Sequence, residues 1–148
     1  MRAVLQRVAR ASVRVGDRLA GEIGAGLLIL LGVANGDTQA QADQLLDKIL
    51  ALRIFENTAG KFDLSLGDVK GSLLVVSQFT LFADTTKGRR PSFSDAARPD
   101  VADELYRYFV ERARDGGVLT ETGEFGAHML VELVNDGPVT LLLDSNGR

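Results

Sequence analysis

Two short apolar runs constrain the fold of this 148-residue chain more than any other feature. They are LLILLGV at residues 27–33 and SLLVVSQFTLFA at residues 72–83, and turn-forming or polar residues flank both. Each is shorter than the roughly 20 apolar residues that a membrane-spanning helix needs. Continuous apolar runs of this length are typical of strands buried on both faces, so we expect a sheet that is covered on each side.

Alternation of apolar and polar residues predicts several more strands. The expected strands cover residues 1–10, 12–15, 19–23, 118–122, 125–134 and 139–143. In the segment NDGPVTLLLD, Gly137 and Pro138 stand directly before the last of these strands. Taken alone, this segment indicates a hairpin corner, because glycine permits unusual backbone dihedrals while proline fixes its own.

Two segments have the apolar periodicity of helices. Thr38 and Gln41 match a capping box, which predicts a helix at residues 38–52. A second helix is expected at residues 99–115, with Pro99 in its first turn and two glycines after its end. Its expected apolar stripe is Val101, Leu105, Tyr108, Phe109 and Arg112. Strands outnumber helices, which favours an α+β fold with a largely antiparallel, barrel-like β-sheet and two main helices packed on it.

Composition limits the organisation and the chemistry of the chain. Its length and its 45% hydrophobic content suit one core, so we expect a single domain over residues 1–148. The first residues lack the features of a signal peptide, which predicts a soluble protein with no membrane partner. The absence of cysteine excludes disulfides and thiolate zinc sites and agrees with a cytoplasmic location. The single histidine, His128, excludes a multi-histidine metal site within one chain and has no obvious nucleophile as a partner.

Charge is distributed unevenly along the chain. A formal net charge of −3 argues against bulk attraction to nucleic acid, and DNA is not an expected partner. Two local basic patches nevertheless occur, one in residues 1–18 and one in residues 87–98. Each patch is compatible with contact to a polyanion and also with an ordinary solvated face.

The familiar catalytic motifs are missing from the sequence. It contains no phosphate-binding loop, dinucleotide fingerprint, H-E-x-x-H, G-x-S-x-G or S-x-x-K. What remains is SQFTL at residues 77–81, where polar side chains interrupt an apolar run. An unpaired polar group in a buried strand costs about 1–3 kcal/mol. These side chains therefore either bond to neighbouring backbone or line a pocket. In the expected strand at residues 125–134, Met129 shares a face with Phe125, and His128 lies on the opposite face.

Four segments, taken together, resemble the D-aminoacyl-tRNA deacylase family. They are MRAVLQRV, KILALRIFE, SQFTLFADTTKGRRPSF and NDGPVTLLLDS, and they occur in the family's order across essentially the whole chain. The resemblance implies a cytoplasmic homodimer that hydrolyses the ester between a D-amino acid and tRNA and that also releases glycine mischarged on tRNA(Ala). It implies aminoacyl-tRNA as the partner and no metal or other cofactor.

The resemblance also implies that L-aminoacyl-tRNA is rejected. In the family, the peptide bond that matches Gly137-Pro138 is cis and projects from one subunit into the active site of the other. Mirror-image amino acids bury the same apolar area, so an apolar pocket cannot separate them by transfer free energy. Rigid backbone carbonyls beside the α-carbon can accept a hydrogen there and reject a β-carbon. Every D side chain, and glycine, should therefore pass.

Roles for other residues follow from the same resemblance. Ser77 and Gln78 are expected to shape the pocket around the ester, and the backbone N–H groups of Phe79 and Thr80 to hold the carbonyl oxygen as negative charge develops. Arg7 is expected to bond the backbone of the Gly-Pro segment. The expected substrate-binding residues are Arg7, Met129, Gly137, Pro138, Val139 and Thr140. The residues expected to contact tRNA phosphates are Lys87, Arg89 and Arg90.

Two alternatives remain open at this point. One is a non-catalytic tRNA-binding homodimer on the same scaffold, and the other is a general esterase with Thr80 as its nucleophile. No general base in the sequence is placed to activate Thr80, and a threonine hydroxyl is a weak nucleophile without one. The sequence therefore favours the family's other mechanism, in which the 2′-hydroxyl of the terminal adenosine assists attack by water.

Overall fold

One long strand, β1 (Arg2–Val15), organises the sheet in the computed structural model, which describes residues 1–146. The first half of β1 pairs antiparallel with β3 (Gly26–Gly32), and its second half pairs antiparallel with β2 (Arg18–Ile23). Strand β8 (Leu130–Asp144) follows β1 antiparallel along nearly its whole length. The two strands expected at residues 1–10 and 12–15 are therefore one continuous strand.

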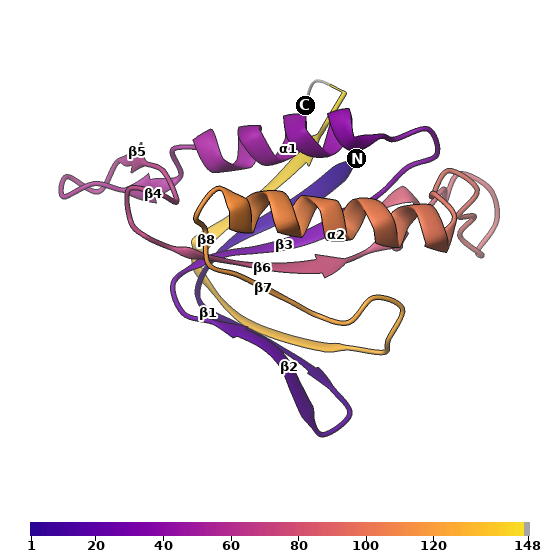
Figure 1. The fold of residues 1–148 in the computed structure, drawn as a ribbon, viewed down its shortest axis with the longest axis horizontal. Helices are drawn as coiled ribbons and strands as arrows, with labels where there is room; N and C mark the ends of the chain where they lie inside the picture. Colours follow the sequence, from indigo (N-terminus) through magenta and orange to yellow (C-terminus); the bar gives the residue numbers. More distant parts are fainter. Residues whose placement is uncertain (147–148) are drawn as a thin grey trace.

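The remaining strands of this sheet are parallel. Strand β6 (Ser72–Ser77) lies parallel to β3, and β7 (Thr120–Thr122) lies parallel to β6. Strand β2 approaches β7 so closely that a Cβ at Gly21 would lie 2.4 Å from a carbonyl oxygen of β7. The sheet thus curls into a nearly closed barrel (Figure 1). The expected α+β, barrel-like fold is confirmed, but the sheet is mixed, because each crossover from β3 to β6 and from β6 to β7 contains a helix.

Both predicted helices are confirmed, and they lie side by side on the same face of the sheet (Figure 1). Helix α1 (Gln39–Ala51) begins with the predicted capping box, in which the Thr38 N–H donates to Gln41 Oε1 at 2.7 Å. Helix α2 (Pro99–Asp115) has proline at its first position. The predicted stripe of α2 is wrong in part, because Val101 is exposed. The buried residues of α2 are Ala102, Leu105, Tyr106, Phe109, Val110 and Ala113.

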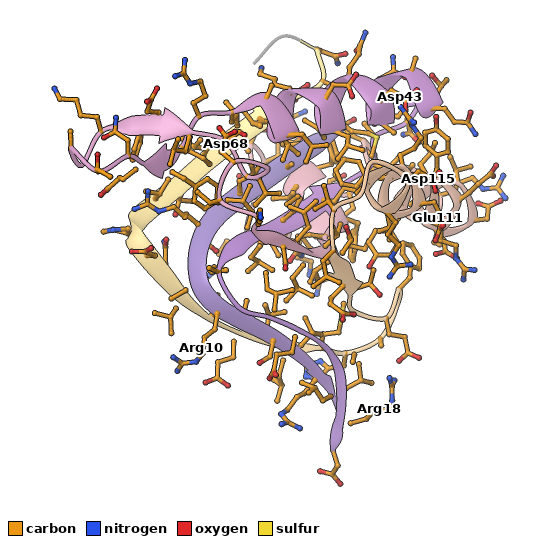
Figure 2. The ribbon with its side chains drawn as sticks, turned by 60° about the vertical axis from the view of Figure 1, so that its left-hand side comes forward. Arg10, Arg18, Asp43, Asp68, Glu111 and Asp115 are labelled. Carbon is orange, nitrogen blue, oxygen red and sulfur yellow. The ribbon has the colours of Figure 1, made fainter. Side chains whose placement is uncertain are left out.

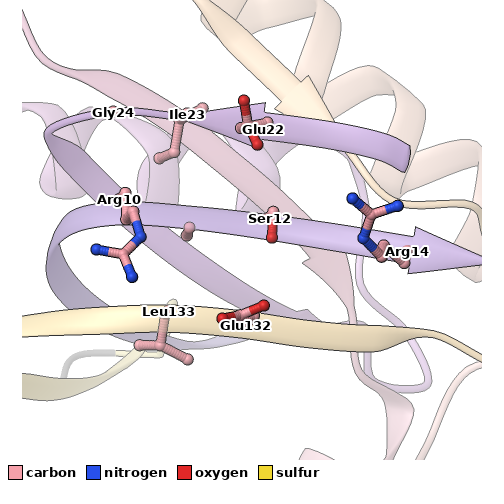
Figure 3. A pocket seen from close by; sticks show the side chains of 9 residues that line it. Arg10, Ser12, Arg14, Glu22, Ile23, Gly24, Glu132 and Leu133 are labelled. Atoms are coloured by element: carbon pink, nitrogen blue, oxygen red, sulfur yellow. The ribbon is translucent and has the colours of Figure 1, made fainter. Parts of the chain in front are cut away.

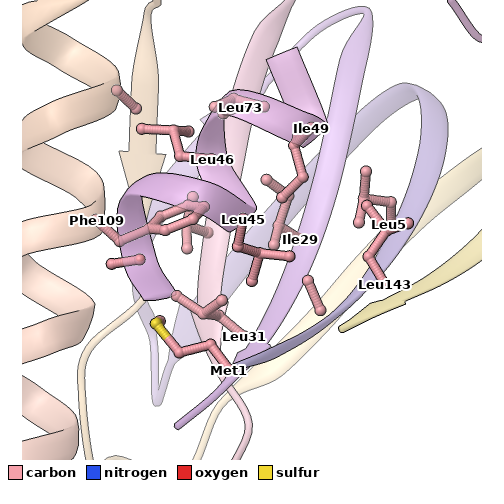
Figure 4. Packing of buried hydrophobic residues seen from close by; sticks show 14 of the residues in the cluster. Met1, Leu5, Ile29, Leu31, Leu45, Leu46, Ile49, Leu73, Phe109 and Leu143 are labelled. Carbon is pink, nitrogen blue, oxygen red and sulfur yellow. The ribbon is translucent and has the colours of Figure 1, made fainter. Parts of the chain in front are cut away.

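Alternate residues of β3 and β6 point into two separate cores. On the side of the helices, Ile29 and Leu31 pack with Leu45 of α1 and Phe109 of α2 (Figure 4). On the other side, inside the barrel, the core is formed by Val8, Ala11, Val13, Ile23, Leu28, Leu74 and Val76. The prediction that these two strands are buried on both faces is confirmed.

The strand formed by the second apolar run is shorter than the sequence predicts. Strand β6 stops at Ser77, and Phe79–Phe82 form a short 3₁₀ helix, η1, where the run at residues 72–83 predicts one strand. The chain turns there because Gly32, at the end of β3, leaves room for η1. A Cβ at Gly32 would lie 3.1 Å from the Phe82 ring and 3.2 Å from Leu81 Cβ.

A second sheet, which the sequence did not predict, consists of β4 (Phe55–Glu56) and β5 (Phe62–Leu64). This small hairpin projects from the end of the molecule beside α1 (Figure 1). Its turn coincides with the polar segment ENTAGK, which interrupts the apolar pattern of the surrounding chain.

The Gly137–Pro138 segment, called the corner below, is a bulge within β8 rather than a hairpin. Strand β8 stays antiparallel to β1 on both sides of it, with Asn135 opposite Val8 and Thr140 opposite Gln6. The residues between Asn135 and Thr140 therefore face a single residue of β1. Proline has no N–H for a strand ladder, and a bulge is one of the places in a sheet that tolerate it. The predicted hairpin, and the strand break that it required, are wrong.

The start of β8 also differs from the prediction. Residues 125–129, which were expected to belong to a strand, lie outside it, and residues 125–127 form a turn in which Gly126 has a φ of +78°. That left-handed conformation suits glycine and interrupts the strand alternation. Strand β8 therefore begins at Leu130.

Charged side chains, among them Arg18 and Glu111, lie on the outside of the molecule (Figure 2). One of them joins the two helices. Asp43 of α1 accepts a hydrogen bond from Arg112 Nε at 3.0 Å and another from the Tyr108 hydroxyl at 2.9 Å, both from α2. The hydrogen bond from Arg112, and then that from Tyr108, hold the pKa of Asp43 below its usual range.

We expect Asp43→Asn to reduce the acid sensitivity of the fold. Because the pKa of Asp43 is lowered in the folded state, its carboxylate stabilises that state above the ordinary carboxyl pKa of about 4. This contribution is lost as the pH falls through the lowered folded value. Urea unfolding at neutral and acidic pH should therefore show a smaller loss of stability on acidification for Asp43→Asn than for the wild type. An equal loss, or the same change in an Asp17→Asn control in the β1–β2 turn, would contradict this.

Candidate functional site

A cavity of about 630 Å³ opens where β6 ends. Its wall combines the end of β6 with η1, the segment that leads into α2, and residues 125–131. The apolar lining residues are Val76, Phe79, Phe93, Ala96, Ala97, Pro99, Ala102, Phe125, Ala127, Met129 and Val131. The polar side chains in the lining are those of Ser77, Gln78, Arg98 and His128. A mainly apolar cavity with a few polar groups is the usual form of a small-molecule site.

The turn from β6 into η1 leaves two neighbouring backbone donors free, and the first of them belongs to Phe79 in the cavity lining. The Gln78 N–H donates to the Leu31 carbonyl at 2.8 Å, and the Leu81 N–H donates to the Gln78 carbonyl at 3.3 Å. Between them, the N–H groups of Phe79 and Thr80 donate to no acceptor within residues 1–146. The first N–H groups of a helix have no partner inside it. Such a pair can stabilise an oxygen atom that gains negative charge during a reaction.

The structure brings Ser77, Gln78 and Phe79, three of the expected site residues, together in the cavity wall. The Thr80 side chain is exposed and is not part of this lining. In the described part of the chain, the hydrogen bond of its hydroxyl is with the side-chain amide of Gln78, which donates to it. An amide N–H cannot take a proton from a hydroxyl, so this contact does not supply Thr80 with a general base.

Met129 and His128 both line the cavity, which differs from the opposite faces that strand alternation predicts. The alternation does not apply because this segment is a turn. Met129 is half-buried against Gly123, where a Cβ would lie 2.5 Å from the Met129 sulfur. The position of Met129 thus depends on a glycine in the chain before it.

Phe93 and Arg98 also line the cavity, although the sequence did not predict them as site residues. The Phe93 ring meets the Phe79 ring edge to face, with 5.0 Å between the ring centroids. An aromatic residue in the otherwise polar segment RRPSF was an available signal. Arg98 carried no such signal, because it lies among other basic residues and its position follows only from the start of α2.

The corner lies outside this cavity. The Gly137-Pro138 peptide bond is cis, and both residues are exposed. A separate hollow of about 430 Å³ beside the corner is lined by Arg7, Phe55, Glu56, Val69, Asp136 and Gly137. The two hollows share no lining residue. Within one chain, the structure does not bring the corner and the predicted pocket residues together.

Arg7 lies behind the corner and is only 5% exposed. Its Nε donates to the Asp136 carbonyl at 2.9 Å, and its Nη1 donates to the Ile54 carbonyl at 2.9 Å. A buried guanidinium is costly unless its donors find acceptors, and these carbonyls supply them. The bond that was expected from Arg7 to the corner thus reaches the residue directly before Gly137.

The other residues predicted around the corner stabilise the bulge itself. Val139 is buried, and its N–H donates to the Asn135 side-chain oxygen at 3.1 Å. The Thr140 hydroxyl accepts a hydrogen bond from the Asn135 amide at 3.1 Å. Asn135 therefore spans the bulge from one end to the other.

The predicted tRNA-binding residues lie apart from the corner. Lys87, Arg89 and Arg90 are all exposed in the loop between η1 and α2. Backbone hydrogen bonds of 2.7 and 2.8 Å between Asp84 and Ser92 close this loop at its base. The three basic side chains thus lie on one closed loop that leads into the cavity wall.

A third hollow, of about 460 Å³, lies over β1, β2 and β8 and holds none of the predicted site residues (Figure 3). Arg10 and Arg14 lie along it, with Glu22 and Glu132 on the neighbouring strands. Among residues 1–146, no group of three or more His, Asp or Glu residues is placed to hold a metal ion. No helix in that range is long and apolar enough to cross a membrane.

Comparison with known sequences identifies one family. The family model described as D-Tyr-tRNA(Tyr) deacylase matches residues 4–144. A D-aminoacyl-tRNA deacylase of Dehalococcoides mccartyi (strain ATCC BAA-2266 / KCTC 15142 / 195) is 61% identical over 100% of this chain and 97% of its own length. A D-aminoacyl-tRNA deacylase of Clostridioides difficile (strain 630) is 58% identical over 99% of this chain and 98% of its own.

Solved structures share the same fold. The structure titled "c-Myc DNA Unwinding Element Binding Protein" has a TM-score of 0.91 and 43% identity, and the match covers 97% of this chain and 98% of that one. The structure of a probable eukaryotic D-amino acid tRNA deacylase has a TM-score of 0.81 with the same coverage. At 20% identity, the second likeness supports the fold alone.

We expect Gly137→Ala to destabilise the protein by about 1–3 kcal/mol, the usual range for strain at a special backbone position. Gly137 has a φ of +140°, and a Cβ there would lie 2.7 Å from Val139 Cγ2 and 3.3 Å from Arg7 Nη2. Gly67→Ala is the matched control, since a Cβ at Gly67 meets only the Ser65 hydroxyl, at 3.8 Å. Urea unfolding measures both. Equal stability of the two variants would show that the corner is not held tightly.

Proposed function

The chain belongs to the D-aminoacyl-tRNA deacylase family, and we propose that its cavity at the end of β6 hydrolyses D-aminoacyl-tRNA while its corner excludes the L-enantiomer. The protein is a hydrolase of ester bonds, and its partner is aminoacyl-tRNA. The observation that carries the proposal is the pair of free N–H groups of Phe79, which lines a mainly apolar cavity, and of Thr80, the next residue in the chain.

Hydrolysis at this site begins with attack of water on the ester carbonyl carbon. The carbonyl electrons move to its oxygen, which the N–H groups of Phe79 and Thr80 stabilise. Loss of one such donor costs about a hundredfold or more in rate in other acyl-transfer enzymes. The bond to the 3′-oxygen of the terminal adenosine then breaks, and that oxygen takes up the proton that the attacking water has lost. The products are the free amino acid and tRNA with a 3′-hydroxyl.

Water, rather than Thr80, is the nucleophile in this proposal. The Thr80 hydroxyl accepts from the Gln78 amide and has no base beside it, so it is not activated. The 2′-hydroxyl of the terminal adenosine can assist the attacking water, and the protein then positions and polarises the ester. Ser77 and Gln78 shape the cavity around it.

The corner of one chain excludes L-amino acids from the cavity of a second chain. Since the corner and the cavity lie apart within one chain, the corner of one subunit completes the cavity of a second copy. Strand β8 supports such an assembly, because in the described chain it pairs with β1 alone and its other edge is free. Carbonyls of the corner beside the substrate α-carbon then meet a hydrogen in D-amino acids and a β-carbon in L-amino acids. Glycine has no β-carbon, so glycyl-tRNA, including glycine mischarged on tRNA(Ala), is also hydrolysed.

We expect the purified protein to release D-amino acids and glycine from charged tRNA and to leave the L form intact. Parallel assays with D-, L- and glycyl-tRNA measure this. Release of the L form at a comparable rate would contradict the filter.

Thr80→Ala should keep its activity within about tenfold of the wild type, since the reaction needs the backbone N–H at this position and not the hydroxyl. A trapped acyl-enzyme, or complete loss of activity in a folded Thr80→Ala variant, would favour covalent catalysis instead.

We expect the triple variant with Lys87, Arg89 and Arg90 changed to Gln to bind tRNA more weakly with little change in kcat. Affinity falls as the salt concentration rises, and each lost phosphate contact should make the slope of log affinity against log salt less steep by about 0.7 for single-stranded RNA. The control changes Lys48, Lys61 and Lys70 to Gln, which removes the same charge from exposed positions elsewhere. Equal effects of the two triple variants on tRNA affinity would mean that the loop makes no specific contact with tRNA.

A further inference from the structure

We infer that the small β4–β5 sheet belongs to the stereochemical filter, with Phe62 and Glu56 as positioning residues that act on the corner through Arg7. The inference rests on the proposed role of the corner and extends it to a part of the fold that contributes no residue to the cavity. Its basis is the arrangement of groups around one buried guanidinium.

Two residues of the hairpin, and Ile54 directly before it, contact the Arg7 guanidinium. The Ile54 carbonyl accepts from Nη1 at 2.9 Å, and Glu56 Oε1 lies 3.5 Å from Nη2. The Phe62 ring covers the guanidinium, with 5.6 Å between Cζ and the ring centroid. A guanidinium is attracted to an aromatic face, which also shields it from water on that side.

The residue before the corner contacts the same guanidinium. Arg7 Nε donates to the Asp136 carbonyl at 2.9 Å and lies 3.9 Å from the Asp136 carboxylate. The guanidinium is planar and its N–H groups have fixed directions. A rotation that improved its contacts with the hairpin would therefore move the donor that holds the carbonyl before Gly137. The orientation of the guanidinium thus links the hairpin to the corner.

The hairpin is stiff enough to fix this orientation. The Asn57 side-chain oxygen accepts from the backbone N–H groups of Ala59 and Lys61 at 2.9 and 3.1 Å, and so closes the turn. At the base, Arg53 Nε donates to the Asp63 carbonyl at 2.7 Å, and the two side chains form an ion pair. Asn57 also donates to Asp63 at 3.3 Å. Hydrogen bonds therefore hold the chain directly before Phe62, at Lys61, and directly after it, at Asp63.

Packing in the apolar cores does not explain a phenylalanine at position 62. Phe62 is 55% exposed and belongs to neither apolar core, so burial of its ring does not explain a phenylalanine at this position. Its contact with the Arg7 guanidinium does. Without the ring, water can reach the guanidinium, and its bond to the Asp136 carbonyl competes with bonds to water. The corner then becomes less rigid, and a β-carbon on the wrong side of the substrate is excluded less strictly.

The test compares kcat/KM for D- and L-tyrosyl-tRNA in the full-length protein and its variants. Phe62→Leu keeps an apolar side chain but has no aromatic face, Phe62→Tyr keeps the face, and Glu56→Gln removes the charge. Phe62→Leu should raise the relative rate on the L substrate by about two- to fivefold, the factor that corresponds to an exposed cation–π contact. The double variant Glu56→Gln/Phe62→Leu should raise it further, and Phe62→Tyr should retain wild-type selectivity. Leu119→Ala, at another exposed apolar residue, is the control and should not change it.

A purely structural role would lower the thermal stability, or the D and L rates together, and would leave their ratio unchanged. An unchanged ratio in the folded Phe62→Leu and double variants therefore overturns the inference, as does a Phe62→Tyr variant that behaves like Phe62→Leu. If the wild type itself hydrolyses both substrates equally, the proposed function fails and the inference fails with it. A selective wild type with equally selective variants overturns the inference alone.

Discussion

The buried guanidinium of Arg7 is the contact on which the arrangement of the corner depends. It lies on β1 at the single residue that faces the bulge of β8, and it is bonded to a carbonyl of the bulge and to a carbonyl before the small sheet. A buried charge requires these acceptors, so three segments that are distant in sequence are fixed relative to one another. The same contact leaves Gly137 and Pro138 on the outside, where they can meet another molecule.

In the proposed function, the separation of the corner from the cavity provides a physical means to sense handedness. The free N–H groups of Phe79 and Thr80 would stabilise charge on the ester oxygen, which is the same for both enantiomers. Discrimination therefore has to come from shape at the α-carbon, and main-chain carbonyls give a shape that does not depend on the side chain of the substrate. The proposal thus assigns chemistry and selectivity to different elements, η1 and β8, and requires a second copy of the chain to bring them together.

Local signals in the sequence predicted the helices and the buried strands, and non-local packing decided the rest. Thr38 with Gln41 and the proline at position 99 mark helix starts through their own hydrogen bonds and dihedrals. The Gly137–Pro138 segment has the composition of a hairpin, and only the long pairing of β8 with β1 makes it a bulge. Likewise, η1 exists because Gly32, on another strand, makes room for it. The cavity could be predicted in part, since SQFT stood out, whereas Phe93 and Arg98 reach it only through the path of the loop.

The most direct test of the account is a crystal structure of the protein with a non-hydrolysable D-aminoacyl adenosine analogue. The proposed function requires two copies in contact, with the analogue in the cavity at the end of β6 and its carbonyl oxygen at the N–H groups of Phe79 and Thr80. The Gly137 and Pro138 carbonyls of the second copy should touch the α-carbon of the analogue. An analogue bound in the cavity with the corner of each copy remote from it would contradict the account.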